Sequence, residues 1–423
     1  MGLRAPGFIP AKLRGAYVDG EGERTKNPLL PEADVMTGKE RVAKTMRHEK
    51  ADRVPVFCQL SIGHYMLRSG EIPYRIWFSP DKFTDALVEF ARRYDFDGVL
   101  VNLPGRPREW ERMISSIETR QGETRISWHG GGVTVCPDAD NAHYSSTRRR
   151  PSIDEIEPAS LYYIEPHCIT EASYPFSFDF AEPGAIYGPA FFPDYYLDSL
   201  TYAVRKCGEL FHVSSEVFSP FTQLMELLGY AEALMALMDD PDKCERCLGS
   251  LAEGCAELAV LQVKAGADAV LVSSAFAGAG FISLEQYRRF VLPYEKSVVE
   301  RLHRETNAPI YVHTCGSIAD RIGAMTEVGY DGIDTMDPPP LGNSDIGRIK
   351  KEFGDDIFLK GNLDPVNILL NGSKEAVRLR AEELIRTAGE GGGYILSTAC
   401  SVPPAADPNK IALLSEASVR SPY

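Results

Sequence analysis

Three residues with metal-binding side chains stand at the ends of two apolar runs. His313 and Cys315 end the run APIYVHTC (308–315), and Cys400 ends the run GYILSTAC (393–400). On a strand, His313 and Cys315 point to the same face, roughly 6–7 Å apart at about 3.3 Å per residue. One imidazole and two thiolates suit zinc, and three protein ligands leave one position open for a substrate. The spacing alone is equally compatible with a buried histidine and two inert core thiols.

Titratable residues near the ends of other apolar runs could take part in the same chemistry. Glu216, Asp334 and Asp337 lie near the ends of two runs, and His64 follows the first run in the chain. Carboxylates and imidazoles serve as general acids and bases, and a carboxylate can also orient a metal-bound histidine. We therefore expect Glu216, Asp337 and His64 to be catalytic residues. Membership in an ion pair is the alternative for each of them.

Eight short apolar runs, most of them separated by helical patterns, account for most of the chain. The runs span residues 53–60, 97–103, 211–218, 267–274, 308–315, 331–337, 356–365 and 393–400. Near-continuous apolar strands are typical of a parallel sheet that is covered on both faces, and eight of them favour a closed barrel. We therefore predict an α/β fold, a single (β/α)8 TIM-type barrel. The carboxyl ends of barrel strands form the active-site rim, so the His and both Cys residues would share one mouth.

Two segments do not follow this alternation. Residues 1–37 are rich in Gly, Pro and charge, and we interpret them as an N-terminal extension. Residues of about 104–183, after the second strand, include alternating polar and apolar residues broken by Gly, which indicates a β-rich insertion. The predicted catalytic domain is therefore the barrel of residues 38–423 with this insertion.

The composition excludes several classes of partner. The chain of 423 residues has a formal net charge of −15, which argues against nucleic acid or an anionic membrane as a partner. Its nine Cys residues, odd in number and widely spaced, indicate reduced thiols rather than a disulfide framework. Because we find neither a signal peptide nor a membrane span, we expect a cytoplasmic protein. A homo-oligomer is compatible with this composition.

Several motifs resemble the uroporphyrinogen decarboxylase superfamily over roughly residues 38–415. They are RVPVF, YVHTCGSI, KGNLDP and GGYILSTACSVPP. The pattern His-x-Cys at the fifth strand plus Cys at the eighth is similar to the zinc-dependent methyltransferase branch of that superfamily. The resemblance implies that His313, Cys315 and Cys400 bind Zn2+. That branch has a further carboxylate ligand downstream; here the segment GIDTMD contains no Glu, and Asp337 is the nearest candidate.

The resemblance also implies methyl transfer involving a corrinoid. The chain lacks the Asp-x-His-x-x-Gly motif of corrinoid-binding modules, so a separate corrinoid protein would supply the cobalamin. The branch contains the methyltransferase components of corrinoid O-demethylase systems and the methylcobamide:coenzyme M methyltransferases. We expect an O-demethylase component here, and a coenzyme M (thiol) methyltransferase is the alternative. A uroporphyrinogen decarboxylase-like decarboxylase is less favoured, because the loop CQLSIGHYMLRSG lacks the Arg-Gln-Ala-Gly-Arg stretch in which uroporphyrinogen decarboxylases resemble one another, and with it the pair of arginines that would hold propionates.

The preference for an O-demethylase rests on aromatic residues. The stretch AFFPDYYLDSL (190–200) is rich in Phe and Tyr, which favours a methoxylated aromatic substrate over a small sulfonated thiol. Core packing is the alternative for this stretch. The residues that we expect to line the substrate pocket are Phe192, Tyr195, Phe218, Phe276 and Asn362.

Overall fold

A computed structural model of the chain describes residues 36–145, 149–165 and 187–421. The expected N-terminal extension, residues 1–37, lies almost entirely outside the described residues and stays a prediction. The first helix, α1, begins at Gly38 after a capping box formed by Thr37 and Glu40.

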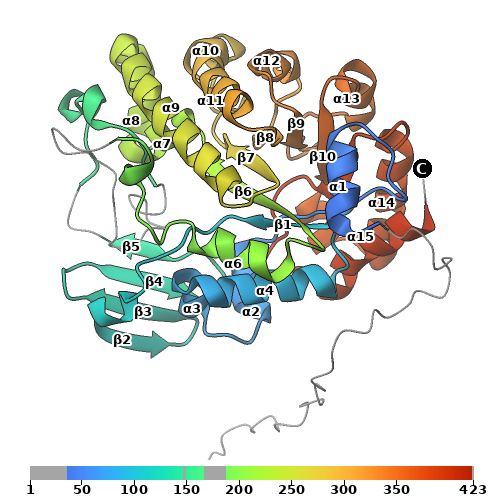
Figure 1. The fold of residues 1–423 in the computed structure, drawn as a ribbon, viewed down its shortest axis with the longest axis horizontal. Coiled ribbons are helices and arrows are strands. Elements are labelled where there is room, and N and C mark those ends of the chain that lie inside the picture. The colour runs from blue at the N-terminus through green and yellow to red at the C-terminus, as the bar shows by residue number, and fades with distance from the viewer. Residues whose placement is uncertain (1–35, 146–148, 166–186, 422–423) are drawn as a thin grey trace, which may run out of the picture. The chain divides into compact units, whose positions relative to one another are not determined.

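A curled parallel sheet of seven strands forms the centre of the fold, with helices along its outer side (Figure 1). The strand order is β1-β6-β7-β8-β9-β10-β11, so strands that follow one another in this series are neighbours in space. The strands are β1 (Gly98–Val101), β6 (His212–Phe218), β7 (Ala269–Ser273), β8 (Ile310–His313), β9 (Gly332–Thr335), β10 (Phe358–Leu363) and β11 (Tyr394–Thr398). The predicted α/β architecture of the TIM type is confirmed.

The prediction of a regular first strand at residues 53–60 is wrong in detail. Instead of a regular strand, this segment makes two isolated parallel bridges, Val56 to Leu396 and Leu60 to Val402. The Val56 carbonyl also accepts a hydrogen bond of 2.7 Å from the Asp97 backbone N–H, just before β1. The segment therefore lies between β11 and β1, the two edge strands of the sheet, but pairs with them only at single residues.

The helices follow the strands in the order that the alternation predicts. The α-helices are α1 (Gly38–Met46), α2 (Ile62–Arg68), α3 (Pro73–Phe78), α4 (Pro80–Arg93), α6 (Asp198–Cys207), α7 (Pro220–Leu228), α8 (Tyr230–Asp239), α9 (Pro241–Lys264), α10 (Leu284–Phe290), α11 (Leu292–Glu305), α12 (Ile322–Val328), α13 (Ile346–Phe353), α14 (Lys374–Ala388) and α15 (Pro408–Arg420). Shorter helical turns are η1 (Trp110–Met113), η2 (Ile153–Glu155), η3 (Pro158–Ser160), η4 (Pro189–Phe191) and η5 (Pro365–Leu370). Within the described ranges, none of these helices has the length and hydropathy needed to cross a bilayer.

The predicted insertion after β1 contains a separate antiparallel sheet (Figure 1). Its strands are β2 (Ile114–Arg120), β3 (Glu123–Trp128), β4 (Val133–Pro137) and β5 (His143–Ser145), paired in that order. Strand β3 alternates half-buried and buried residues, as expected for a sheet with one packed face. The later part of the insertion, residues 166–186, lies outside the described residues.

The interior of the parallel sheet changes from apolar to polar along the strands. An inner cluster of buried residues contains Leu100, Leu271, Tyr311 and Ile395, and side chains of α1 also join it. Residues paired in a parallel sheet share a face, so the registers Glu216–Leu271 and Lys360–Ile395 point these two charged side chains inward as well. The polar half lies toward the carboxyl ends of the strands, where barrel enzymes build their active sites.

Candidate metal centre

The His and the two Cys residues singled out by the motifs lie together at this rim. The Nε2 atom of His313 is 3.4 Å from the Cys315 Sγ atom and 3.9 Å from the Cys400 Sγ atom. The three donor atoms all lie within 4.8 Å of one another, and no other group of three or more such residues is found in the described part of the chain. Strand β8 ends at His313, so Cys315 is a loop residue rather than the strand residue that the sequence predicted.

The donor set fits a zinc ion. Bonds of about 2.3 Å to sulfur and about 2.0 Å to nitrogen give tetrahedral donor–donor edges of about 3.5–3.8 Å. The two measured nitrogen–sulfur distances bracket these values. A set of one imidazole and two thiols is also soft enough for zinc and leaves the fourth corner of the tetrahedron free.

The two thiols differ in acidity. A hydrogen bond from Cys315, supported by the neighbouring imidazole, holds the pKa of the Cys400 thiol well below its usual range. The same hydrogen bond, together with burial, raises the pKa of Cys315. A shared proton between the two thiols leaves one of them as a thiolate, the form that binds metals.

A buried ion pair stands behind the imidazole of His313. The Nδ1 atom of His313 lies 3.5 Å from Oδ2 of Asp334, and Nζ of Lys360 lies 2.9 Å from the same oxygen. Burial acts to raise the pKa of Asp334, but the Lys360 and His313 charges outweigh it and lower that pKa. Asp334 is therefore a carboxylate, and it faces the imidazole nitrogen opposite the one beside the thiols. At this distance His313 Nδ1 makes no hydrogen bond in the described structure, so Asp334 acts on the imidazole through its charge. A carboxylate hydrogen-bonded there would also fix the tautomer and orientation of a metal-bound histidine.

Asp337 lies beside the cluster but outside its donor set. Its Oδ2 atom accepts a hydrogen bond of 2.7 Å from the backbone N–H of Gly316, the residue after Cys315. Burial raises the pKa of Asp337 to about 6. The structure thus gives Asp337 a role in holding the Cys315 loop, and its expected catalytic role stays a prediction.

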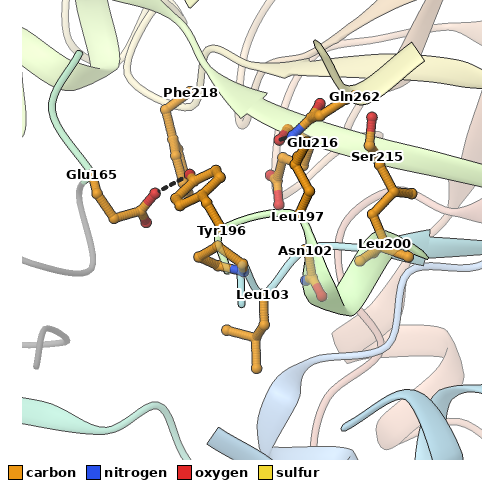
Figure 2. A pocket seen from close by; sticks show the side chains of 12 residues that line it. Asn102, Leu103, Glu165, Tyr196, Leu197, Leu200, Ser215, Glu216, Phe218 and Gln262 are labelled. Atoms are coloured by element: carbon orange, nitrogen blue, oxygen red, sulfur yellow. Dashed lines mark hydrogen bonds between the residues drawn. The ribbon is translucent and has the colours of Figure 1, made fainter. Parts of the chain in front are cut away.

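Glu216 lies at a small cavity between the carboxyl ends of β1 and β6. The cavity measures about 20 Å³, room for about one water molecule, and Asn102, Glu165 and Tyr196 also line it (Figure 2). The Tyr196 hydroxyl donates a hydrogen bond of 2.5 Å to Glu165, the dashed line in Figure 2. Burial raises the pKa of Glu216 to about 7, so this carboxyl can hold or release a proton near neutral pH.

Among the described residues, the five predicted pocket residues have different surroundings. Phe218 lines the Glu216 cavity. Phe192 is buried in an aromatic cluster with Tyr162, Tyr163 and Tyr196, which is the core-packing alternative for its stretch.

The other three pocket residues have separate surroundings. Phe276 packs against Tyr230, with ring centroids 4.7 Å apart. The side chain of Asn362 is buried and donates a hydrogen bond of 2.8 Å to the Met336 carbonyl. The Tyr195 carbonyl accepts the backbone N–H of Asp198 at 3.0 Å, just before α6.

His64 is engaged in packing rather than free to act as a base. Its Nε2 atom lies 2.8 Å from the Tyr94 hydroxyl, and its Nδ1 atom lies 3.1 Å from the Pro404 carbonyl. The ring also packs edge-on against Phe90. Burial lowers the pKa of His64 to about 4, so it is neutral at physiological pH. These contacts are those of a structural histidine, and the expected catalytic role of His64 stays a prediction.

Sequence reasoning missed Lys360, the residue that neutralises Asp334. Lys360 is 1% exposed, and its Nζ atom lies 4.9 Å from the centroid of the Phe57 ring. The sequence does contain an indication of this ion pair, because a lysine lies within the otherwise apolar strand IFLKGNL (357–363). A charged residue within a buried strand needs an opposite charge nearby.

A family model described as Uroporphyrinogen decarboxylase (URO-D) matches residues 189–420, more than half of the chain. Curated relatives include the uroporphyrinogen decarboxylase of Thioalkalivibrio sulfidiphilus, 34% identical over 183 residues, 42% of this chain and 49% of the relative. The uroporphyrinogen decarboxylase of Chlorobium phaeobacteroides is 28% identical over 213 residues, 48% of this chain and 57% of the relative. The chain thus spans about half the length of these two relatives.

A solved structure of a methyltransferase from Methanosarcina mazei superposes on most of the chain. The TM-score is 0.65, and the match covers 91% of this chain and 99% of the other. The sequence identity is 16%, so this match shows a common fold alone.

Proposed function

The chain belongs to the uroporphyrinogen decarboxylase family, and within that family of enzymes we propose that it is a zinc-dependent methyltransferase. It would move a methyl group from a methoxylated, aromatic substrate to the Co(I) corrinoid of a separate corrinoid protein. The observation that carries this proposal is the cluster of His313, Cys315 and Cys400 at the carboxyl end of the sheet. A decarboxylase of the kind named among the curated relatives would leave this cluster without a role.

The three donors would hold zinc, and the free fourth corner would face the substrate. Zinc bound there supplies a Lewis acid that polarises the ether oxygen of a methoxyl group. The protein's own groups set this site in place. Asp334 would fix the ring of His313, Lys360 keeps Asp334 ionised, and Asp337 holds the loop that carries Cys315.

The proposed transfer balances without a further reactant. The bond between the methyl carbon and the ether oxygen breaks, and the methyl carbon bonds to cobalt, which is oxidised from Co(I) to Co(III). The oxygen keeps the electron pair and leaves as a phenolate. Glu216, whose pKa is about 7, would supply the proton that converts the phenolate into a phenol.

A spectrophotometric assay tests this proposal. The zinc-loaded protein is mixed with cob(I)alamin and a methoxybenzoate, and absorbance follows the loss of Co(I) and the formation of methylcobalamin. We expect formation with the wild type and with the matched control Cys207→Ser, a buried thiol that bonds only within α6. Cys400→Ser should abolish it.

Other outcomes would overturn the proposal. If the ether gives no spectral change but a thiol demethylates methylcobalamin, the protein is a thiol methyltransferase. If neither reaction occurs and uroporphyrinogen loses carbon dioxide, the protein is a decarboxylase like its curated relatives.

A further inference from the structure

A second and much larger concavity lies between α3, α4, α6 and the loop after β1. It measures about 890 Å³, within the size range of small-molecule sites. Its walls come from α3, the start of α4, the loop after β1 with η1, and α6. We name it the basic groove, because its lining includes the cations Arg75, Lys82, Arg106, Arg108, Arg205 and Lys206. The residues that line it and those that line the Glu216 cavity are different.

The charge of the basic groove opposes that of the whole chain. Six Lys and Arg residues line it against three acidic residues, Asp81, Glu111 and Asp198, whereas the chain carries a net charge of −15. A concave surface with one excess sign of charge concentrates the field and attracts ligands of the opposite sign. Glu71 and Asp85, carboxylates outside the lining, also offset Lys82 and Lys206, so the excess of positive charge in the groove is small and rests on Arg75 and Arg205.

Three of these cations already have carboxylate partners, but two do not. Arg108 pairs with Asp198 at 3.1 Å, and Lys82 and Lys206 pair with Glu71 and Asp85. Among the described residues, Arg75 and Arg205 have no carboxylate partner.

The two arginines differ in their surroundings. The Nε atom of Arg75 is shielded from solvent and has no hydrogen-bond partner in the described structure. Arg205 lies over the ring of Tyr202, 4.7 Å from its centroid, and this Tyr also lines the groove. The exposed Arg205 guanidinium is therefore placed to donate to an anion in the groove, and Arg75 lines the groove with a buried Nε atom that has no partner among the described residues.

The basic groove also has a rigid, partly aromatic wall. Arg106 is 1% exposed, and its guanidinium lies 5.8 Å from the centroid of the Trp77 ring. Trp110 lines the groove and stacks on Phe78, with ring centroids 5.0 Å apart. A buried cation held against packed aromatic rings is a fixed feature of the site, unlike a lysine on a mobile surface.

We propose that the basic groove binds a small polyanion that carries two or more phosphate or carboxylate groups. The size of the groove fits a molecule of nucleotide dimensions, and its aromatic residues fit a planar ring next to the charged groups. This site is separate from the metal centre, and the proposal does not rest on methyl transfer.

Isothermal titration calorimetry of the full chain with three probes tests the proposal. The probes are pyrophosphate, citrate and ADP, which separate phosphate, carboxylate and ring-dependent recognition. We expect at least one of them to bind at one site per chain. Arg75→Gln and Arg205→Gln should each weaken binding about tenfold, the value of one charge-assisted hydrogen bond.

A matched control separates a built site from general electrostatic attraction. The single variants Arg304→Gln and Arg386→Gln each remove one exposed arginine, from α11 and from α14, with the same change of charge as either groove variant. These controls should bind like the wild type. Because Arg205 is exposed, its variant keeps the test valid even if Arg75→Gln disturbs folding. No binding of any probe at millimolar concentration, or equal weakening by the control variants, would overturn the proposal.

Discussion

Replacing Asp334, the carboxylate of the ion pair behind His313, should lower both the stability of the protein and its affinity for zinc. Asp334→Asn removes the negative charge 3.5 Å from His313 Nδ1 and leaves Lys360 as a buried, uncompensated cation. Breaking a buried pair by removing one partner costs about 3–5 kcal/mol of unfolding free energy. Loss of the carboxylate behind a metal-bound His lowers metal affinity about 10- to 100-fold. Both losses are expected in this single variant.

The double variant Asp334→Asn with Lys360→Met distinguishes the two losses. Removing the buried cation should restore most of the unfolding free energy, because Lys360 no longer needs a counter-charge. Zinc affinity should stay low, because the carboxylate that orients His313 is still missing. Urea unfolding with a chelator present measures stability, and competition with a chromophoric chelator measures zinc affinity. If Asp334→Asn binds zinc within twofold of the wild type, Asp334 does not orient the ligand and this reasoning is refuted.

Three further substitutions test other parts of the account. Glu216 has a pKa of about 7 in the folded chain against 4.5 for a free side chain, so the folded state binds the extra proton between these pH values. The unfolding free energy of the wild type should therefore fall, relative to Glu216→Gln, by up to about 3 kcal/mol as pH rises from 4.5 to 7. If the unfolding free energies of the two proteins change with pH in parallel, the pKa of Glu216 is not raised. His64→Leu should lower the unfolding free energy by about 1–3 kcal/mol and leave the zinc content unchanged. A loss of zinc in this variant would show that His64 contributes to the metal site. Asp337→Ala should weaken zinc binding far less than Cys400→Ser; equal losses would make Asp337 a fourth ligand.

The sequence brings His313, Cys315 and Cys400 together, as the structure does, because a rule of topology applies to them. In a parallel barrel all strands end at one rim, so His313 and Cys400 could be placed together although many residues separate them. The register of single strands is harder to predict. Strand β8 ends at His313, and the segment of Val56 makes only isolated bridges, because backbone pairing depends on the neighbouring strands.

Side-chain partners were less predictable than strand ends. Glu216 and Lys360 both point inward, but the sequence does not say that Lys360 meets Asp334 while Glu216 meets a cavity. Aromatic residues in the sequence were the least reliable indication of where a substrate pocket lies. Phe192 is expected in a substrate pocket and lies in a buried aromatic cluster, and the sequence does not distinguish the two because the same apolar surface suits both environments.

The most direct test of the central claim is the zinc content of the purified wild-type protein, measured by elemental analysis beside Cys400→Ser and the matched control Cys207→Ser. The account predicts about one zinc per chain in the wild type and in the control, and loss of zinc in Cys400→Ser. Absence of zinc from the wild type after reconstitution, or full retention of zinc in Cys400→Ser, would contradict it.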